Sequence, residues 1–154
     1  MSRPSILARW RVRIYSAAPG LLQRWAVRLF KPTYPLAVAV VVCDDHGDIL
    51  LLHHTYGEPK WRLPGGLVER GEEVFVAAVR EVAEEASCAI APVAIADAAA
   101  TKASFDIAVA ARLTAIQPFS ANAETCDRKW VNPAVASELS ELQQRFIAAA
   151  CRLL

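Results

Sequence analysis

The stretch from Gly65 to Cys88 reads GGLVERGEEVFVAAVREVAEEASC and gathers acidic residues on one predicted helix. A helix over residues 74–86 turns by about 100° per residue, so Glu81, Glu84 and Glu85 fall within about one third of its circumference. The opposite side carries an apolar stripe that should anchor the helix on a core, made of Phe75, Val76, Val79, Val82, Ala83 and Ala86. We therefore expect three carboxylates that are held together and face outward.

Two interpretations of this acidic face are open: a solvated surface and a metal site. Carboxylates three and four residues apart repel one another, and a bound cation relieves that repulsion. Oxygen ligands at this density suit Mg²⁺ or Mn²⁺. The residues around the helix favour the metal site, because the preceding Leu63-Pro64-Gly65-Gly66 is typical of a turn whose backbone approaches a ligand. Arg80 lies four residues before Glu84, close enough to orient its carboxylate.

This string resembles the Nudix box, in which a glycine, a glutamate and an Arg-Glu-aliphatic-x-Glu-Glu helix follow one another at fixed spacing. The matching residues are Gly66, Glu72, Arg80, Glu81, Val82, Glu84 and Glu85. Ser87 stands where the family has glycine, at the end of the helix, where a left-handed backbone is common. Serine adopts that backbone with strain, so the helix exit is expected to differ while the carboxylates stay in place.

The resemblance implies a divalent-metal-dependent hydrolase of a nucleoside diphosphate linked to another moiety, with water attacking a phosphoanhydride bond. Cations would polarise the phosphoryl oxygens and offset the repulsion between an anionic substrate and the acidic helix. Glu81, Glu84 and Glu85 resemble the family's metal ligands, and Gly65 resembles its carbonyl ligand. We expect Mg²⁺ as the cofactor, with Mn²⁺ as a substitute.

The same resemblance assigns catalytic roles to further residues. Arg80 and Glu72 look like the family's orienting residues. The general base is either a glutamate of the box or one from a later loop, and Glu124 resembles that later residue because it lies six positions before Trp130. An exposed loop carboxylate with no role is the alternative for Glu124. The candidate catalytic set is thus Glu72, Arg80, Glu81, Glu84, Glu85 and Glu124.

A polar and aromatic loop over residues 53–62 precedes the box, and in the Nudix family this region lies near the substrate. Tyr56 or Trp61 would stack on a base, and His54 or Arg62 would reach a phosphate. A core aromatic beside the box is the alternative for Trp61, and a surface or hydrogen-bonded role is the alternative for the histidine. Asp106, on a predicted strand, is a further candidate for a substrate contact.

The first 34 residues form a distinct electrostatic unit. Of the 17 basic residues in the chain, seven precede Asp44, and no acidic residue does. Residues 6–15 and 21–30 are predicted to form two short helices, the second amphipathic. Three interpretations are open: an arm packed on the domain or on a second subunit, a membrane-surface helix, or a transit peptide.

Residues 35–154 are predicted to form one α/β domain. Strands are expected over residues 36–43, 49–53, 89–98, 105–114 and 129–131, with a last helix over residues 138–153. Strands and helices that alternate around a mixed sheet give an α/β/α sandwich, the fold that the resemblance also implies. The apolar content of 55% argues against disorder.

The partners follow from these observations. We expect a small-molecule nucleotide or nucleoside diphosphate derivative as substrate and no nucleic acid. The four cysteines lack the close pairs of a zinc or redox site, so we interpret them as free thiols in a reducing compartment and expect a cytoplasmic location. The alternative function is a non-catalytic nucleotide-binding or regulatory module, docked to a membrane or partner by the basic arm. Full retention of the glutamates and arginine of the box favours the enzyme.

Overall fold

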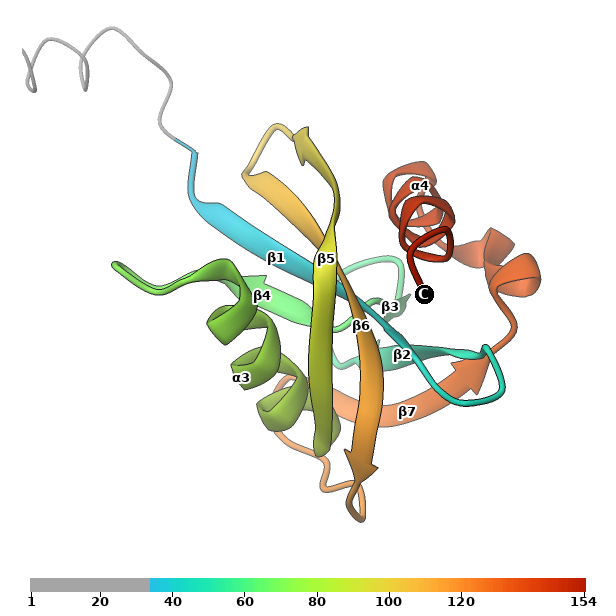
Figure 1. Ribbon diagram of the computed structural model, residues 1–154. Helices are drawn as coiled ribbons and strands as arrows, with labels where there is room; N and C mark the ends of the chain where they lie inside the picture. Colours follow the sequence, from blue (N-terminus) through green and yellow to red (C-terminus); the bar gives the residue numbers. More distant parts are fainter. Residues whose placement is uncertain (1–33) are drawn as a thin grey trace, which may run out of the picture. The chain divides into compact units, whose positions relative to one another are not determined.

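The computed structural model describes residues 34–154, in which one mixed sheet carries helices on both faces (Figure 1). The elements in chain order are β1 Leu36–Cys43, β2 Ile49–His54, β3 Trp61–Arg62, β4 Gly65–Leu67, α3 Val74–Ala86, β5 Cys88–Ala100, β6 Phe105–Ile116, β7 Thr125–Val131, the 3-10 helix η1 Pro133–Glu138, and α4 Glu141–Ala150. Among the described residues, no helix is long and apolar enough to cross a membrane. The predicted arm lies outside the described residues except for Tyr34, so its helices, its contacts and its boundary stay predictions.

Strand β1 lies at the centre of the sheet because its apolar, largely β-branched residues can be buried on both faces. It runs parallel to β6 from Leu36, opposite Phe105, to Cys43, opposite Arg112. The strand order is β3-β2-β1-β6-β5, with β4 antiparallel to β1 and β7 antiparallel to β2. β1 and β2 meet at Cys43 and Ile49 beside their turn, and β4 takes the place beside the first half of β1.

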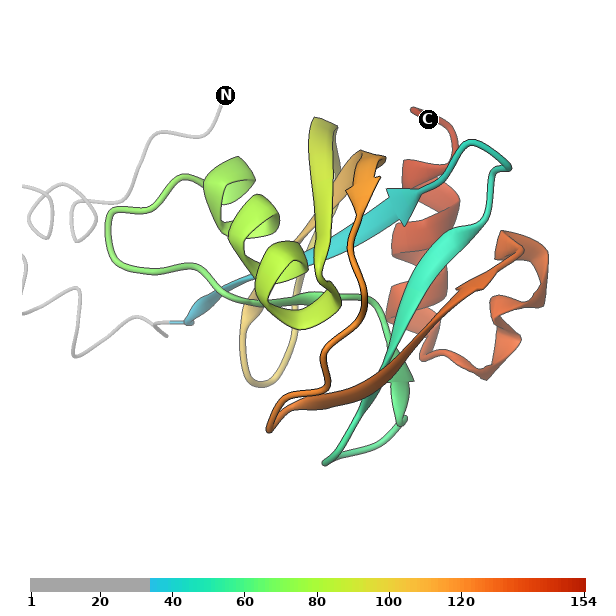
Figure 2. The same cartoon turned by 90° about the horizontal axis from the view of Figure 1, so that it is seen from below.

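Alternate residues of β1 pack into opposite layers, as the two-residue period of a strand requires. Val38, Val40 and Val42 belong to the core cluster that contains α3 side chains, whereas Val41 belongs to the cluster that contains α4 side chains. Figure 2 shows the two helices on opposite sides of the sheet. This arrangement confirms the predicted α/β/α sandwich with a mixed sheet.

The strand boundaries differ from the prediction where pairing extends or creates a strand. β7 begins at Thr125 and not at residue 129, because Thr125 already pairs with His54 of β2. Residues 61–62 and 65–67, expected as loop and turn, form β3 and β4 by pairing with the longer strands β2 and β1. Short segments of this kind carry little periodicity, so only the pairing reveals them.

The last helix is shorter than the predicted range of residues 138–153. Asn132 begins η1, and its side chain accepts a hydrogen bond from the amide of Ala134. Ser140 then caps α4 by accepting a hydrogen bond from the amide of Gln143. Because this cap gives a partner to an amide that the helix itself cannot satisfy, α4 begins at Glu141 and ends at Ala150.

Helix α3 has the predicted bounds but not the predicted orientation. The stripe expected to anchor it is mostly exposed: Phe75 is 41% exposed, Val76 55% and Val79 39%, and Ala83 is exposed as well. The buried residues are Ala77, Ala78, Val82, Glu85 and Ala86. The small alanines of this buried face let the helix approach the sheet closely. The helix is thus rotated about its axis from the expected orientation, which turns the carboxylate of Glu85 inward, so the expectation of an outward acidic face is wrong for Glu85.

Ser87 ends α3 in the left-handed conformation that the family's glycine suggested, with φ 52° and ψ 42°. Its amide donates to the carbonyl of Ala83 at 3.2 Å. A residue with a Cβ is strained in this region by about 1–2 kcal/mol. The expectation that the helix exit differs is therefore wrong: Ser87 adopts the left-handed backbone itself, at a cost that a glycine would not carry.

We expect Ser87→Gly to stabilise the domain by about 0.5–1 kcal/mol, because relief of the strain exceeds the conformational entropy that glycine loses on folding. Urea denaturation followed by circular dichroism measures the change. Ala83→Gly, at an exposed position inside the same helix, is the matched control and should destabilise by about 1 kcal/mol. A loss of stability in Ser87→Gly would contradict the strain at this position.

Candidate active site

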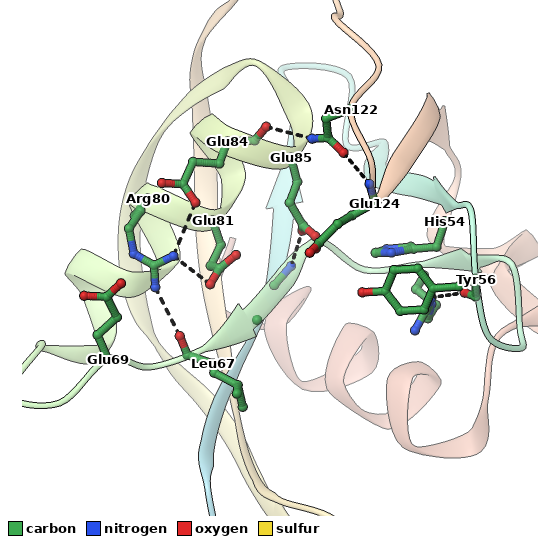
Figure 3. A pocket seen from close by; sticks show the side chains of 13 residues that line it. His54, Tyr56, Leu67, Glu69, Arg80, Glu81, Glu84, Glu85, Asn122 and Glu124 are labelled. Atoms are coloured by element: carbon green, nitrogen blue, oxygen red, sulfur yellow. Dashed lines mark hydrogen bonds and ion pairs between the residues drawn. The ribbon is translucent and has the colours of Figure 1, made fainter.

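A cavity of about 600 Å³ is lined by α3, β4 and the segments that follow β2 and precede β7 (Figure 3). Its lining includes most residues predicted as functional, namely His54, Tyr56, Arg62, Gly65, Arg80, Glu81, Glu84, Glu85 and Glu124. Gly66, Leu67, Glu69 and Asn122 complete the lining. The chain thus brings together residues from four separate segments, with the acidic helix forming one wall.

Two glycines of β4 make room for the carboxylates of α3. The amide of Gly65 donates to Glu85 Oε2 at 2.9 Å. A Cβ at Gly65 would lie 2.0 Å from the carbonyl oxygen of Val38, and the φ of Gly65 is +148°. A Cβ at Gly66 would lie 2.5 Å from Glu81 Oε1. A side chain at Gly65 would therefore collide with the backbone of β1, and one at Gly66 would displace the carboxylate of Glu81.

Arg80 connects the acidic residues on this wall. Its guanidinium donates to both carboxylate oxygens of Glu72, at 2.9 and 3.0 Å, and to Glu81 at 2.8 Å. A longer contact of 3.4 Å reaches Glu84, and Nη2 also donates to the carbonyl of Leu67 at 3.1 Å. Hydrogen bonds from Arg80 lower the pKa of Glu72. Glu72 does not line the cavity. It anchors Arg80, which orients the carboxylates of Glu81 and Glu84 in the cavity lining.

The three glutamates of α3 differ in environment. Glu84 is 62% exposed on its side chain and Glu81 only 12%, while Glu85 as a residue is 5% exposed. Burial, with the negative charges of Glu81 and Glu124, raises the pKa of Glu85 to about 7 despite the Gly65 amide and Arg62. Glu85 is thus partly protonated near neutral pH, in a cluster whose negative charge is incompletely neutralised.

Side chains from the β7 segment hold the C-terminal end of α3. Asn122 Nδ2 donates to the carbonyl of Glu84 at 3.3 Å, and Thr125 Oγ1 donates to the carbonyl of Glu85 at 3.0 Å. The guanidinium of Arg128 contacts the carbonyls of Ala86 and Ser87. Carbonyls at a helix end lack partners within the helix, so these three residues complete its hydrogen bonding.

The same segment positions Glu124. Its amide donates to Asn122 Oδ1 at 2.8 Å, and its carbonyl accepts from the amide of Thr55 at 2.9 Å. Asn122 Oδ1 also accepts from the amide of Thr125 at 2.7 Å. The backbone of Glu124 is therefore tied to the end of α3 on one side and to the end of β2 on the other, while its carboxylate lines the cavity.

The wall facing α3 contains His54, Tyr56 and Arg62. The rings of His54 and Tyr56 meet edge to face with centroids 6.2 Å apart. Arg62 donates to the carbonyl of Tyr56 at 2.7 Å, and its guanidinium carbon lies 5.6 Å from the Tyr56 ring centroid. Burial, with smaller contributions from the positive charges of Arg62 and His53, lowers the pKa of His54 to about 4. The imidazole is therefore neutral near pH 7.

Trp61 and Asp106 were predicted as substrate contacts, but the structure places neither in the cavity lining. Trp61 packs on the α4 side, with the His53 ring centroid 4.9 Å and Lys129 Nζ 4.1 Å from its ring centroid. It precedes Arg62 on β3, and successive side chains of a strand point to opposite faces. Asp106 lies on β6 and accepts a hydrogen bond from Ser104.

Sequence reasoning missed Asn122, Thr125 and Arg128. Their partners on α3 lie 38, 40 and 42 residues earlier in the chain, and no fixed spacing signals such contacts. One local signal was present, because an asparagine two residues before Glu124 is typical of a turn in which the side chain accepts from the backbone.

The donor set of the acidic wall fits a hard divalent cation in chemistry. Carboxylate oxygens and a glycine carbonyl are what Mg²⁺ and Mn²⁺ prefer, and the carboxylates gathered in the cavity lining carry negative charge that a cation would neutralise. In the described part of the chain, however, no three His, Cys, Asp or Glu side chains are arranged as a metal cluster. Arg80 draws Glu81 and Glu84 toward itself.

Comparisons with known proteins agree with this geometry. A model of the NUDIX domain matches residues 33–150. The ADP-ribose pyrophosphatase of Mycobacterium tuberculosis is 45% identical over 53 residues, which are 32% of this chain and 26% of that protein. The chain thus matches only about a quarter of the length of this relative.

Two solved structures share the fold. The MutT protein from Methanosarcina mazei Go1 superposes with a TM-score of 0.63 at 22% identity, covering 80% of this chain and 96% of that one. An Ap4A hydrolase of C. elegans, solved as a binary complex, gives a TM-score of 0.63 at 21% identity, covering 73% and 92%.

We expect Glu85→Gln to change how stability depends on pH in metal-free buffer. The folded protein binds the Glu85 proton more tightly than the unfolded chain, so this group's contribution to stability falls as the pH rises from 4.5 to about 7. At pH 8 the variant should be more stable by about 2–3 kcal/mol. Denaturation at several pH values with EDTA measures the difference between the proteins, and a difference that does not change with pH would contradict this expectation.

Thr125→Val should destabilise the domain by about 1–3 kcal/mol, because it leaves the buried carbonyl of Glu85 without its hydrogen bond while keeping the side-chain shape. The free energy of unfolding from urea titration is the measurement. Thr55→Val, which removes an exposed hydroxyl that donates to the carbonyl of Ala123 at 2.8 Å, is the control and should cost less. If Thr125→Val were as stable as the unmodified protein, the hydrogen bond from Thr125 to the end of α3 would not contribute to stability.

Proposed function

Because this chain belongs to the Nudix family, whose domain model matches residues 33–150, we propose that it hydrolyses a phosphoanhydride bond in a nucleoside diphosphate derivative. Water is the nucleophile, and a divalent cation is the cofactor. The observation that carries this proposal is the convergence of Glu81, Glu84, Glu85 and Glu124 on one cavity with Arg62 in its lining.

The residues of the acidic wall would hold the cation. Glu81, Glu84, Glu85 and the carbonyl of Gly65 are the candidate ligands, and Arg80, anchored by Glu72, sets the orientation of two of them. Mg²⁺ is the proposed ion and Mn²⁺ its substitute. When bound, such a cation supplies charge that stabilises the phosphoryl oxygens and lowers the pKa of water.

The protein's own groups would move the proton of the attacking water. Glu85 lies in the cavity lining, and its carboxylate accepts a hydrogen bond from the amide of Gly65. Glu124 lies in the same lining on a backbone fixed from two sides. Either carboxylate is a candidate base. The water oxygen would form a bond to phosphorus while the base takes the proton of the water. The P–O bond of the anhydride would break, and the leaving phosphate would depart with the bonding electrons.

Arg62 and Tyr56 are the proposed contacts to the rest of the substrate. The guanidinium would bind a phosphate oxygen, and the exposed Tyr56 ring would stack on a base. ADP-ribose is the first substrate to test, because the Mycobacterium tuberculosis relative bears that name. Trp61 and Asp106 are not part of this proposal.

A non-catalytic nucleotide-binding module is the second candidate. It is favoured by one observation, the pairing of Glu81 and Glu84 with Arg80 in place of a three-carboxylate metal cluster. An enzyme must release those carboxylates to the cation, whereas a module that only binds a nucleotide need not. Turnover decides between the two.

The purified full chain should hydrolyse at least one member of a panel of ADP-ribose, nucleotide sugars, dinucleoside polyphosphates and nucleoside triphosphates, in Mg²⁺ but not in EDTA. Glu85→Gln should lower kcat/KM by about 100-fold or more, because it removes both a ligand charge and a candidate base. Glu73→Gln makes the same change at the exposed N-cap of α3 and should be neutral. Binding without Mg²⁺-dependent turnover would instead support the non-catalytic module.

A further inference from the structure

Unpaired buried polar atoms concentrate on one wall of the cavity. Within residues 34–154, the buried side-chain nitrogen and oxygen atoms that have no hydrogen-bond partner are His54 Nδ1, His54 Nε2 and Arg62 Nε. Both residues line the cavity, and His54 is only 5% exposed. Buried polar atoms without partners are rare in folded proteins because each loses its hydration. All three belong to residues that line one cavity, so a ligand bound there is the expected source of the missing partners.

The fold holds His54 in this position. It is the last residue of β2, its amide donates to the carbonyl of Lys60 at 2.8 Å, and it pairs with Thr125 of β7. Arg62 pairs with Leu52 on the adjacent strand β3. In Figure 3 the imidazole lies beside Tyr56, across the cavity from Arg80 and Glu81. Neighbouring strands therefore present the two orphaned groups from one wall.

The chemistry of these atoms restricts what they bind. A neutral imidazole offers one donor and one acceptor nitrogen, whereas Arg62 Nε only donates. Phosphate oxygens accept hydrogen bonds and satisfy Arg62, but they leave the acceptor nitrogen of His54 unpaired. A hydroxyl group can donate to that nitrogen. The low pKa of His54 agrees, because a neutral ring has the acceptor nitrogen that an imidazolium lacks.

We propose that His54 binds a sugar hydroxyl of the substrate while Arg62 Nε binds an adjacent phosphate oxygen. This proposal rests on the proposed function for the class of ligand, a nucleoside diphosphate derivative. It replaces the expectation that His54 reaches a phosphate. The hydroxyl belongs either to the ribose of the nucleoside or to a sugar on the far side of the diphosphate, and both sources present the same chemistry.

Equilibrium binding separates this proposal from hydrolysis. The probe is ADP-ribose with a methylene bridge between its phosphorus atoms, which cannot be cleaved there, titrated with Mg²⁺ in a calorimeter. One comparison probe lacks the 2′ and 3′ hydroxyls of the adenosine ribose, and another carries a methyl ester in place of the far ribose. Loss of affinity with the first comparison probe identifies the nucleoside ribose, and loss with the second identifies the far sugar.

Three variants complete the design. His54→Phe keeps a planar ring without nitrogens and should weaken the parent probe by about tenfold. His54→Gln keeps a donor and an acceptor and should stay within about threefold of the parent protein. His53→Phe changes the neighbouring histidine, which contacts Cys126 and Trp61 outside the cavity lining, and should leave affinity unchanged. Melting of His54→Phe should be equal or higher, because the imidazole it replaces has no partner.

Each result decides the proposal. The proposal is supported if His54→Phe binds the methylene-bridged ADP-ribose more weakly than the unmodified protein does. In addition, removing the hydroxyls that matter to the unmodified protein should no longer lower the affinity of this variant. The proposal is overturned if His54→Phe lowers the affinity for all three probes equally or leaves it unchanged. It is also overturned if the unmodified protein binds none of the probes. Hydroxyl-dependent binding without turnover of the panel would uphold the role of His54 while the proposed hydrolysis fails.

Discussion

The packing of the Glu85 carboxylate of α3 against the glycines of β4 is the constraint on which the rest of the domain depends. Glu85 is buried and accepts from the amide of Gly65, at a place where β4 has no room for a Cβ. The burial of Ala77, Ala78, Val82 and Ala86 in the core accompanies this contact in one rotation of α3 about its axis. This rotation explains why Phe75, Val76 and Val79 face solvent although they are the larger apolar residues of the helix. This orientation accommodates Glu85 although its ionised form is costly to bury, as its raised pKa indicates.

The cavity has two walls of different electrostatic character. The wall formed by α3 carries crowded carboxylates, and the facing wall carries a guanidinium and an imidazole that burial keeps neutral. Arg62 influences both, because its charge lowers the pKa of His54 and partly offsets the rise at Glu85. A phosphate group complements the guanidinium and a hydroxyl group complements the neutral imidazole, whereas the carboxylate wall accepts an anion only with a cation between them.

The sequence predicted elements that carry their own periodicity or local signals. The bounds of α3, the central strand β1 and the layered fold follow from patterns within 8 to 13 consecutive residues. The rotation of α3 about its axis was not predictable, because helical periodicity shows which residues share a face but not which face packs against the sheet. Trp61 and Arg62 could not be separated until β3 was known to be a strand, which sends adjacent side chains to opposite faces. Pairing across the sheet is non-local information.

The ending of α3 has a consequence for the order in which the molecule assembles. Its final carbonyls take their partners from residues 122, 125 and 128, which leave the ribosome well after the helix does. Until β7 docks on β2, water must satisfy those carbonyls, and the backbone of Glu124 has no fixed place. The hydrogen bonding at the end of the acidic helix is therefore completed only after residues 122–128 have been synthesised. A nascent chain that stops before residue 122 contains the whole acidic motif and still lacks an enclosed site.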